Sequence, residues 1–365
     1  MINILQVVGK MNRGGAETFL MNIFRGINKK KYKFYFVVFD KNKGDFDDEI
    51  LSLGGEIIYI KGKNSIARFF HLLYFLLKSK NKFSIIHSHL LFNDAFHLLA
   101  AKLCNIKTRI SHSHSSLYKV KESFFDKFYK FFMRFLISRT ATVRLACGLH
   151  AGKYLFGEKK FNVFNNAVDL SVFSKIKEKN ANSWDEFIQE SNILKIIQVG
   201  RLTALKNHLF SISVANELKQ RNIDFLFVIA GQGEDELIIR NEIEKYQLSN
   251  NIRLVGVRTD IPELMSGADI LLLPSYYEGF PVVLVESQSI GLYSIISDFI
   301  SKEVDFGLNL ISFQPIDSEK RWADCIQNYK SKINKFDMSK NLKTLKSKGF
   351  DLQENILKIE ELYDK

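Results

Sequence analysis

The feature that most constrains the fold of this chain is a repeated alternation between short apolar runs and longer segments of helical length. The apolar runs fall into two series separated by a polar stretch. They are Ile2–Val8, Phe34–Phe39, Ile57–Ile60, Phe83–Ile86, Thr108–Ser111 and Val143–Ala146, then Ile193–Val199, Phe225–Ala230, Ile252–Val255, Ile270–Leu273 and Tyr293–Ser297. Strands that alternate with helices form βαβ units, and strands covered on both faces are apolar throughout. The pattern predicts an α/β protein with two doubly wound parallel sheets.

The polar stretch between the two series predicts a domain boundary. From Lys175 to Asn192 the sequence has no sustained apolar periodicity. At 365 residues, of which 46% are hydrophobic, the chain is long enough for two domains with separate cores. We therefore expect an N-terminal domain at residues 1–170, a second domain at 171–345, and a C-terminal helix at 346–365 that packs back on the first domain.

Composition narrows the class of protein. Three isolated cysteines, without a C-x-x-C pair, predict neither a disulfide framework nor a zinc site and suit a reducing cytosol. The first ten residues lack the basic leader and long apolar core of a signal peptide, so we expect a cytoplasmic protein. A net charge of +12 admits nucleic acid, anionic membrane or phosphorylated substrates as partners. No zinc-knuckle, P-loop or RNP-like motif favours nucleic acid, and we expect none as a partner.

Two glutamates eight positions apart mark a candidate site in the second domain. The segment Asp269–Gly291 has the pattern of a buried strand, a loop and a helix, with Pro281 at the first helical position. Glu278 then lies in the loop and Glu286 inside the helix. Ligands of open α/β sheets bind at this edge, where unpaired helix N–H groups favour phosphate. The pair is expected to hold two parts of a hydroxyl-rich or phosphorylated ligand; the alternative is two ordinary surface charges.

Cations and glycines follow other strands of both domains. Arg201 and Lys206 come after the first strand of the second domain, where two fixed cations suit a diphosphate without a metal. Gly14 and Gly15 follow the first strand of the chain, and their backbone N–H groups can approach a phosphate or sugar closely. Gly231 belongs to a G-x-G that follows a later strand. The alternatives are flexible turns and solvated surface charges.

Histidines follow two strands of the first domain. The strand Thr108–Ser111 leads directly into His112 and His114, and His87 and His89 lie at the end of the preceding strand. All are expected at the sheet edge that carries the paired glycines. Their spacing, without a matching cysteine or carboxylate, is poor for zinc. We favour hydrogen bonding to a sugar or an acceptor, with a loop-stabilising role as the alternative.

Together these motifs resemble the retaining glycosyltransferases of family 4, which have two Rossmann-like domains facing a central cleft in the arrangement called GT-B. The resemblance runs nearly end to end. It lies in GGAE at Gly14–Glu17, GRLTALKNH at Gly200–His208, GQGE at Gly231–Glu234, the segment Leu254–Ser287, and Glu303. The E-x7-E spacing in its strand, loop and helix setting, combined with the upstream Arg/Lys pair, makes the combination specific.

The resemblance implies roles on the donor side of the reaction. Arg201 and Lys206 would hold the donor diphosphate and stabilise the leaving nucleotide. Glu286 would accept hydrogen bonds from the ribose hydroxyls, and Glu278 would contact the donor sugar. The backbone at Gly279 and Phe280 would share that contact, with Gly231 also on the donor side.

On the other domain, the resemblance implies that Gly15 lies near the diphosphate and that His112 lines the sugar and acceptor site. Gly14 and His114 belong to the acceptor side. No metal and no cofactor are implied, since the nucleotide sugar is a substrate. The resulting prediction is a metal-independent, retaining hexosyltransferase that uses a nucleotide sugar, UDP-linked by expectation.

The acceptor side is further indicated by the segment Phe124–Arg139. At helical spacing it places six phenylalanines on one arc and Asp126, Lys127, Lys130 and Arg134 on the other. The six are Phe124, Phe125, Phe128, Phe131, Phe132 and Phe135. Such a helix can lie in an anionic membrane surface, and the alternative is that the phenylalanines face the core. Ile66–Leu77 is apolar nearly all round but too short to span a membrane.

These features predict a transferase attached peripherally to the inner face of the plasma membrane. It would extend a lipid-linked glycan in bacterial capsular, exopolysaccharide or lipopolysaccharide assembly, as the resemblance implies. Two alternatives stay open. One is a sugar-nucleotide epimerase of GT-B fold, and the other is a non-catalytic basic protein that binds membrane or RNA.

Overall fold

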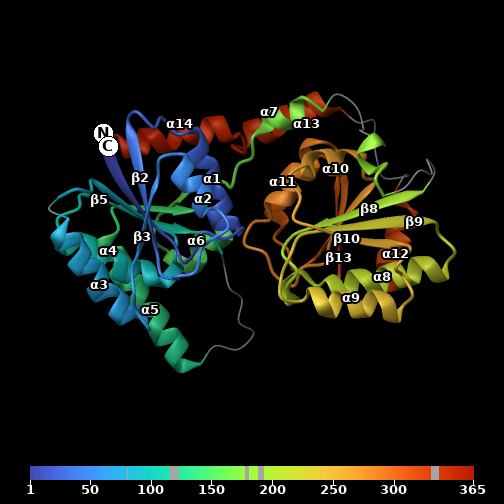
Figure 1. The fold of residues 1–365 in the computed structure, drawn as a ribbon, viewed down its shortest axis with the longest axis horizontal. Coiled ribbons are helices and arrows are strands. Elements are labelled where there is room, and N and C mark those ends of the chain that lie inside the picture. Colours follow the sequence, from blue (N-terminus) through green and yellow to red (C-terminus); the bar gives the residue numbers. More distant parts are fainter. Residues whose placement is uncertain (80, 116–122, 177–180, 188–192, 330–336) are drawn as a thin grey trace. The chain divides into compact units, whose positions relative to one another are not determined.

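The computed structural model describes residues 1–79, 81–115, 123–176, 181–187, 193–329 and 337–365. The chain divides into two compact units: residues 1–167 with 349–365 form the first, and residues 168–348 form the second. Each unit is built on one parallel sheet with helices against both faces (Figure 1). The predicted fold class, two doubly wound Rossmann-like units, is confirmed.

The first unit has a seven-stranded sheet in the order β3-β2-β1-β4-β5-β6-β7. Every neighbouring pair is parallel. The strands are β1 (Ile2–Val7), β2 (Tyr32–Val38), β3 (Glu56–Tyr59), β4 (Ile85–Ser88), β5 (Thr108–Ser113), β6 (Val143–Ala146) and β7 (Asn162–Val163). The helices are α1 (Gly15–Gly26), α2 (Asp47–Ser52), α3 (Ser65–Lys78), α4 (Asp94–Leu103), α5 (Phe124–Thr140), α6 (Leu149–Phe156) and α14 (Leu352–Tyr363).

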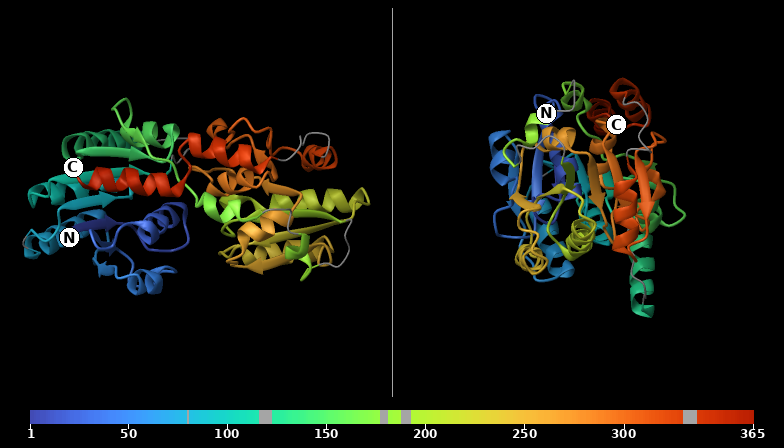
Figure 2. Two further views of the ribbon diagram at one scale, coloured as in Figure 1. Left: turned by 90° about the horizontal axis from the view of Figure 1, so that it is seen from above. Right: turned by 90° about the vertical axis from the view of Figure 1, so that its right-hand side faces the viewer.

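The two faces of the first sheet are covered by different helices. Ile4, Ile85 and Ile110 point to the face where α1 and α14 pack, and Leu5 and Ile86 point to the face where α3 and α4 pack. Successive strand residues point to opposite faces, which produces this division. Helix α14 is the last helix of the chain, and it lies beside α1 on the first unit (Figure 1, Figure 2).

The second unit has a six-stranded parallel sheet in the order β10-β9-β8-β11-β12-β13. The strands are β8 (Leu194–Val199), β9 (Phe225–Ala230), β10 (Ile252–Gly256), β11 (Ile270–Leu273), β12 (Tyr293–Ser297) and β13 (Ile311–Gln314). The helices are α7 (Leu170–Ser174), α8 (His208–Gln220), α9 (Glu236–Lys245), α10 (Ile261–Gly267), α11 (Val282–Ser289), α12 (Glu319–Gln327) and α13 (Met338–Ser347). Its core packs α8, α9 and α12 on one face of the sheet.

Strand order reverses once in each sheet, between β1 and β4 in the first and between β8 and β11 in the second. In doubly wound sheets, ligands bind beyond the carboxyl ends of the strands at such a reversal. The candidate residues lie at the carboxyl ends of β1, β4 and β5 in the first unit and of β8, β9 and β11 in the second, or in the segments that follow these ends; His112, expected just after its strand, lies within β5. Each sheet thus positions its candidate residues beside its own reversal point.

The structure describes part of the stretch that the sequence marks as a boundary. Residues 177–180 and 188–192 of it lie outside the described residues. Between them, Ala181–Trp184 form a short 3-10 helix. Trp184 is fully buried, and its indole N–H donates to the carbonyl of Leu264 in α10 over 2.8 Å. One aromatic side chain therefore attaches this polar segment to the second unit.

Helix α5 presents its apolar arc outward. Its six phenylalanines are between 46% and 81% exposed, while its buried residues are Met133, Ile137 and Thr140. Lys130 and Arg134 lie against the unit instead, over the rings of Tyr154 and Phe92. The alternative in which the phenylalanines face the core is therefore wrong. Within the described chain, no helix combines the length and the apolar character needed to cross a membrane.

Candidate functional site

The loops that follow β8 and β9 pack backbone against backbone. Gly200 donates its N–H to the carbonyl of Ala230, and Leu202 donates to the carbonyl of Gln232. Gly231 has a φ of +151°, and a Cβ atom there would lie 1.9 Å from the carbonyl oxygen of Gly200. Only glycine permits so close an approach in that conformation. Packing therefore requires Gly231, and its contact with a donor stays a prediction.

Lys206 and Glu278 form an ion pair between the loops that follow β8 and β11. The Lys206 amino group donates to Glu278 Oε1 over 2.5 Å, and the Ser275 hydroxyl donates to the same oxygen over 2.7 Å. Both side chains are largely buried. The N–H of Tyr276 also donates to the carbonyl of Leu205, so the two loops are joined through their backbones as well. Two residues predicted separately from the sequence are in direct contact.

Arg201 directly follows Gly200 and is exposed. Its guanidinium forms no hydrogen bond or ion pair with any residue of the described chain. Gly279 and Phe280 continue the loop after Glu278, and Phe280 is buried. A free cation thus lies in the same loop as Lys206, whose charge is paired, and this arrangement leaves Arg201 available to an anion.

Glu286 lies in the second turn of α11, with Pro281 as the N-cap. The residue is half-buried, and its side chain has no hydrogen bond to any residue that the structure describes. Burial raises the pKa of its carboxyl to about 7. Removal of water disfavours the charged form, so near neutral pH this group is present in both protonation states. A ligand hydroxyl would supply the missing hydrogen bonds.

In the first unit, α1 begins at the paired glycines. Gly14 is the N-cap and offers no side chain, and a Cβ atom on Gly15 would meet nothing within 4 Å. The helix N-terminus is therefore open beside Gly15, whereas the Glu17 carboxylate lies beside Gly14. One turn later, the ring of Phe19 packs 5.1 Å from that of His112 and 5.3 Å from that of His114. The glycines and histidines share one sheet edge, as the strand pattern predicts.

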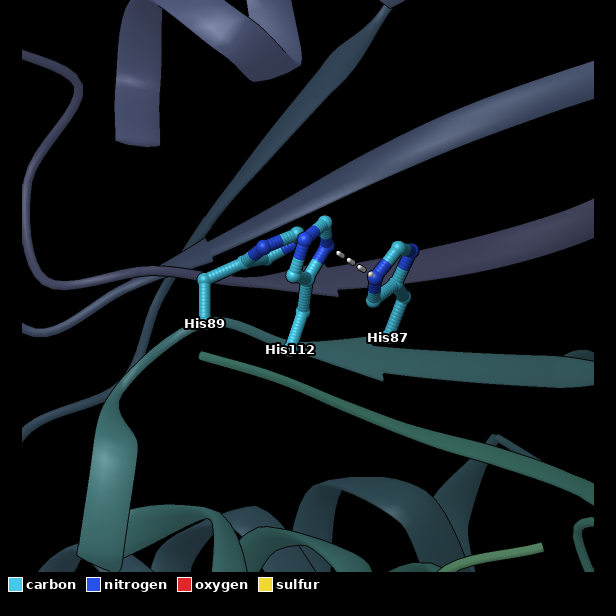
Figure 3. Close-up of side chains that lie close together, drawn as sticks. All are labelled: His87, His89 and His112. Atoms are coloured by element: carbon cyan, nitrogen blue, oxygen red, sulfur yellow. Dashed lines mark hydrogen bonds between the residues drawn. The ribbon is translucent and has the colours of Figure 1, made fainter. Parts of the chain in front are cut away.

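Four histidines gather at the carboxyl ends of β4 and β5, His87 and His112 within the strands and His89 and His114 just beyond them. Three of the four are drawn in Figure 3. His87 Nε2 lies 3.2 Å from His112 Nδ1, and His89 Nδ1 lies 2.8 Å from His114 Nε2. Burial lowers the pKa of every one of these rings, that of His114 to about 3. The four rings are therefore uncharged at neutral pH and bind neighbours as neutral imidazoles.

A buried carboxylate holds the two histidine-bearing strands together on the opposite face. Asp94 accepts hydrogen bonds from the hydroxyls of Ser88 and Ser111 and from the N–H of Leu90. Burial raises its pKa to about 7, against the opposing effect of these hydrogen bonds. Asp94 gives no signal in the sequence because its partners become neighbours only through the register of β4 and β5.

Nitrogen atoms of His87, His89 and His112 lie within 4.8 Å of one another, which is the spacing that metal ligands need. These rings already use their nitrogens in hydrogen bonds, apart from Nε2 of His112. The group offers no anionic ligand, so the charge of a divalent ion would be buried without compensation. The residues fit a hydrogen-bonded network better than a metal site, and a metal-free reaction stays a prediction.

Both units match known protein families in sequence. Residues 13–172 match the model of Glycosyltransferase Family 4, and residues 180–305 match that of glycosyl transferases group 1. A Bacillus subtilis protein named as a glycosyltransferase, EpsF, is 35% identical over 369 residues, which cover 97% of this chain and 94% of EpsF. This chain belongs to glycosyltransferase family 4. The family membership expected from the motifs is thereby confirmed, and retention of configuration stays a prediction.

Other relatives agree with this membership of the family 4 glycosyltransferases. The capsular polysaccharide biosynthesis glycosyltransferase CapH of Staphylococcus aureus is 27% identical, over 100% of this chain and 99% of its own. The crystal structure of Anabaena Alr3699/HepE in complex with UDP superposes with a TM-score of 0.78 at 16% identity, covering 100% of both chains. The HepE structure supports the fold, and the names of EpsF and CapH favour a glycosyltransferase over an epimerase or a non-catalytic binding protein.

Proposed function

We propose that this family 4 glycosyltransferase transfers a hexose from a UDP-sugar to a lipid-linked glycan with retention of configuration, in the assembly of a bacterial surface polysaccharide. The observation that carries the proposal is the Lys206–Glu278 ion pair at the strand-order reversal of the second sheet. It places a cation for a diphosphate beside a carboxylate for a sugar. Arg201 adds a second cation in the same loop as Lys206.

These residues suggest how the donor reacts. When the donor binds, its diphosphate competes with Glu278 for Lys206, and Arg201 supplies the additional positive charge. Both cations stabilise the negative charge that develops on the departing nucleotide, which is the main catalytic need in such a transfer. Glu278, held by Ser275, orients the sugar. The acceptor hydroxyl then attacks the anomeric carbon on the face that the nucleotide leaves, as the resemblance to retaining enzymes implies. The new glycosidic bond forms as the bond to the diphosphate oxygen breaks, and the proton of the hydroxyl passes to the departing diphosphate.

The choice of donor and acceptor is supported by relatives. An Escherichia coli relative is named UDP-Gal:alpha-D-GlcNAc-diphosphoundecaprenol alpha-1,3-galactosyltransferase, and it is 28% identical over 80% of this chain and 77% of its own. The HepE structure contains UDP. Both support a UDP-linked donor, and the first supports an acceptor carried on a lipid diphosphate. CapH, by its name, supports a role in surface polysaccharide assembly.

We further propose that α5 attaches the enzyme to an anionic membrane. The exposed phenylalanines of α5 can enter the lipid surface, and the exposed cations Lys127 and Arg139 can contact lipid headgroups. On α3, Ile66, Phe70 and Tyr74 are also exposed and extend the apolar surface of the unit. Attachment would place the protein at the cytoplasmic face, where a lipid-linked acceptor is found.

The test begins with a screen of nucleotide sugars for protection against thermal unfolding, because a ligand of the folded state raises its apparent stability. With the selected donor, release of UDP is measured with and without a lipid-linked acceptor. Lys206→Ala and Glu286→Ala should each lower kcat/KM by about 10²–10³-fold. Lys245→Ala, which removes an exposed ion pair of α9, is the matched control.

Two results would contradict this assignment. Full activity in both site variants would exclude the donor site, and interconversion of a nucleotide sugar without a glycoside product would indicate an epimerase. The anomeric configuration of the product, measured by NMR, decides retention separately.

A further inference from the structure

One face of the first sheet changes from apolar to polar side chains along its strands. At the amino ends, Ile4, Ile85 and Ile110 pack in the apolar core under α1 and α14. Two residues later along each strand, the same face carries Gln6, His87 and His112. His89 and His114 follow at the next positions of that face. All these polar side chains lie in or beside the protein interior, so each requires hydrogen-bond partners.

The partners are arranged in two arms that start at Gln6. In the first arm, Gln6 accepts at Oε1 from His89 Nε2 over 3.0 Å, and His89 Nδ1 lies 2.8 Å from His114 Nε2. A neutral imidazole carries one proton, so His89 uses it toward Gln6 and accepts from His114 at Nδ1. The proton of His114 is then on Nε2. Its Nδ1 is left as an acceptor, and it is one of the buried atoms without a partner among the described residues.

The second arm starts at the amide nitrogen of Gln6, which donates to the hydroxyl of Tyr363 over 3.0 Å. Tyr363 lies in α14 and contacts His87 Nδ1 over 2.9 Å. With its oxygen already accepting from Gln6, the hydroxyl directs its own proton to His87. His87 then donates from Nε2 to His112 Nδ1 over 3.2 Å. The proton of His112 is left on Nε2, which also has no partner in the described structure.

Each arm has an open end, the ring nitrogen without a partner in the described structure: His114 Nδ1 in the first arm and His112 Nε2 in the second. These two nitrogens lie on neighbouring rings and have opposite hydrogen-bonding roles. The rings of His112 and His114 are 4.0 Å apart between centroids, beside Phe19. His112 ends the second arm with an N–H donor, and His114 ends the first arm with an acceptor. The opposition arises at Gln6, because an amide has one donating and one accepting end. If the amide turns over, both arms reverse and the two ends exchange roles, but they stay opposite.

We propose that Gln6 and Tyr363 are positioning residues that give His112 and His114 opposite hydrogen-bonding roles, and that this pair selects a hydroxyl group of the sugar or acceptor. A hydroxyl accepts one hydrogen bond and donates another, so it satisfies both open ends with one atom. A carbonyl or a phosphate oxygen can only accept. The selection rests on the proposed function and on the expectation, from the family resemblance, that His112 lines the sugar and acceptor site, whereas the two-arm network rests on the described contacts alone.

The network is tested by the protonation of individual ring nitrogens. The chain has eight histidines, so NMR of protein labelled with ¹⁵N-histidine resolves protonated from unprotonated ring nitrogens for each of them. His87, His89, His112 and His114 should share one tautomer, with the proton on Nε2. All four on Nδ1 would mean that the Gln6 amide is turned over and would equally support the two arms. A mixed pattern in the native protein, or a zinc-dependent change in these signals, would overturn the proposal.

Two variants separate positioning from packing. In Gln6→Glu, the carboxylate accepts from both His89 and Tyr363, so His87 and His112 should move their protons to Nδ1 while His89 and His114 keep theirs on Nε2. Both open ends then become acceptors, and one hydroxyl cannot satisfy them. The variant should lose roughly tenfold in kcat/KM, the effect of one mismatched hydrogen bond. An unchanged four-ring pattern in this variant would overturn the proposed arms.

Tyr363→Phe keeps the buried ring and removes the link between Gln6 and His87, so it should also lower kcat/KM several-fold. Tyr32→Phe is the matched control, because the Tyr32 hydroxyl contacts α14 at Asp364 without touching the histidines. The control should retain the native tautomers and the native rate. A predicted tautomer pattern with full activity in Gln6→Glu would overturn the selection of a hydroxyl. Loss of donor binding in Lys206→Ala tests the proposed function independently.

Discussion

At the scale of single residues, the protonation state of Glu286 depends on its surroundings in the fold. Burial raises its pKa to about 7, and the ionised form is the one that accepts hydrogen bonds from ribose hydroxyls. At pH 6 about one molecule in ten is ionised, so the dissociation constant for the nucleotide sugar should be about tenfold weaker at pH 6 than at pH 8. Calorimetric titration with the donor from the screen measures this, since its diphosphate does not titrate in that range.

The raised pKa of Glu286 also predicts the direction in which the stability of the protein changes with pH. Its folded-state pKa is raised above the unfolded value, so in the window between the usual carboxyl range and about pH 7 the unfolded chain has released a proton that the folded chain retains. The contribution of Glu286 to the free energy of unfolding therefore falls as pH rises through this window. Glu286→Gln should flatten both the binding profile and this component of the stability profile. A tenfold pH effect that survives in Glu286→Gln would assign it to another group.

Some functional residues can be predicted from the sequence, whereas contacts between distant residues cannot. Lys206 and Glu278 could be predicted because each follows a recognisable strand, although their contact across 72 positions could not. The hydrogen bond between Gln6 and Tyr363 could not be predicted, because the two residues are 357 positions apart and meet only when α14 packs on the first sheet. Gly231 was predicted as a ligand contact, which stays a prediction, and the structure adds a packing requirement that the sequence did not indicate. Chemistry carried by one loop is visible in a sequence, and chemistry shared by distant elements is not.

At the scale of elements, α5 has an outward apolar arc. Phe128 and Phe132 are well exposed, so replacing both by Asp should abolish binding to vesicles that contain anionic lipid while leaving the fold intact. Sedimentation with vesicles in low salt measures the binding, and circular dichroism checks the fold. Higher salt should weaken binding of the native protein, because it screens Lys127 and Arg139.

The control for α5 is Met133→Ala on the buried side of the same helix. Met133 is buried, so this change should cost about 2–5 kcal/mol of unfolding free energy and leave vesicle binding unaffected. Unchanged vesicle binding after both Asp substitutions would exclude α5 as the attachment surface, because two charges in its apolar arc should prevent that arc from entering lipid.

Helices and most strands were predicted closely, including the edge strands β3 and β10, but the other edge strand of each sheet was not. The sequence indicates a helix over Ile66–Leu77, and α3 spans Ser65–Lys78. Two strands escaped detection, β7 with only two exposed residues and β13 with four partly buried ones. Edge strands have one neighbour and less cover, so they need no continuous apolar run. Pro281, predicted as the first helical residue, is the N-cap of α11, which is within the ordinary variation of helix ends.

At the scale of the whole molecule, the chain returns to the first unit to complete it. After the second unit ends at Lys348, α14 adds Ile356, Ile359 and Tyr363 to the core that β1 and α1 begin. The hydroxyl of Tyr32 also donates to Asp364, next to the chain end. The first unit therefore cannot be complete until its last helix is made, while the second unit is continuous in sequence.

This connection predicts which unit a change in α14 will affect. Ile359 is almost fully buried, so Ile359→Ala should cost about 2–5 kcal/mol, whereas Leu357→Ala on the exposed side of α14 should cost little. Because α14 packs on the first unit, hydrogen exchange should quicken in β1, α1 and α14 and stay native in β8, β9 and β11. Donor affinity should also be retained, since Arg201, Lys206 and Glu286 belong to the second unit. Equal acceleration in both units would mean that they unfold as one cooperative body and would contradict the division seen here.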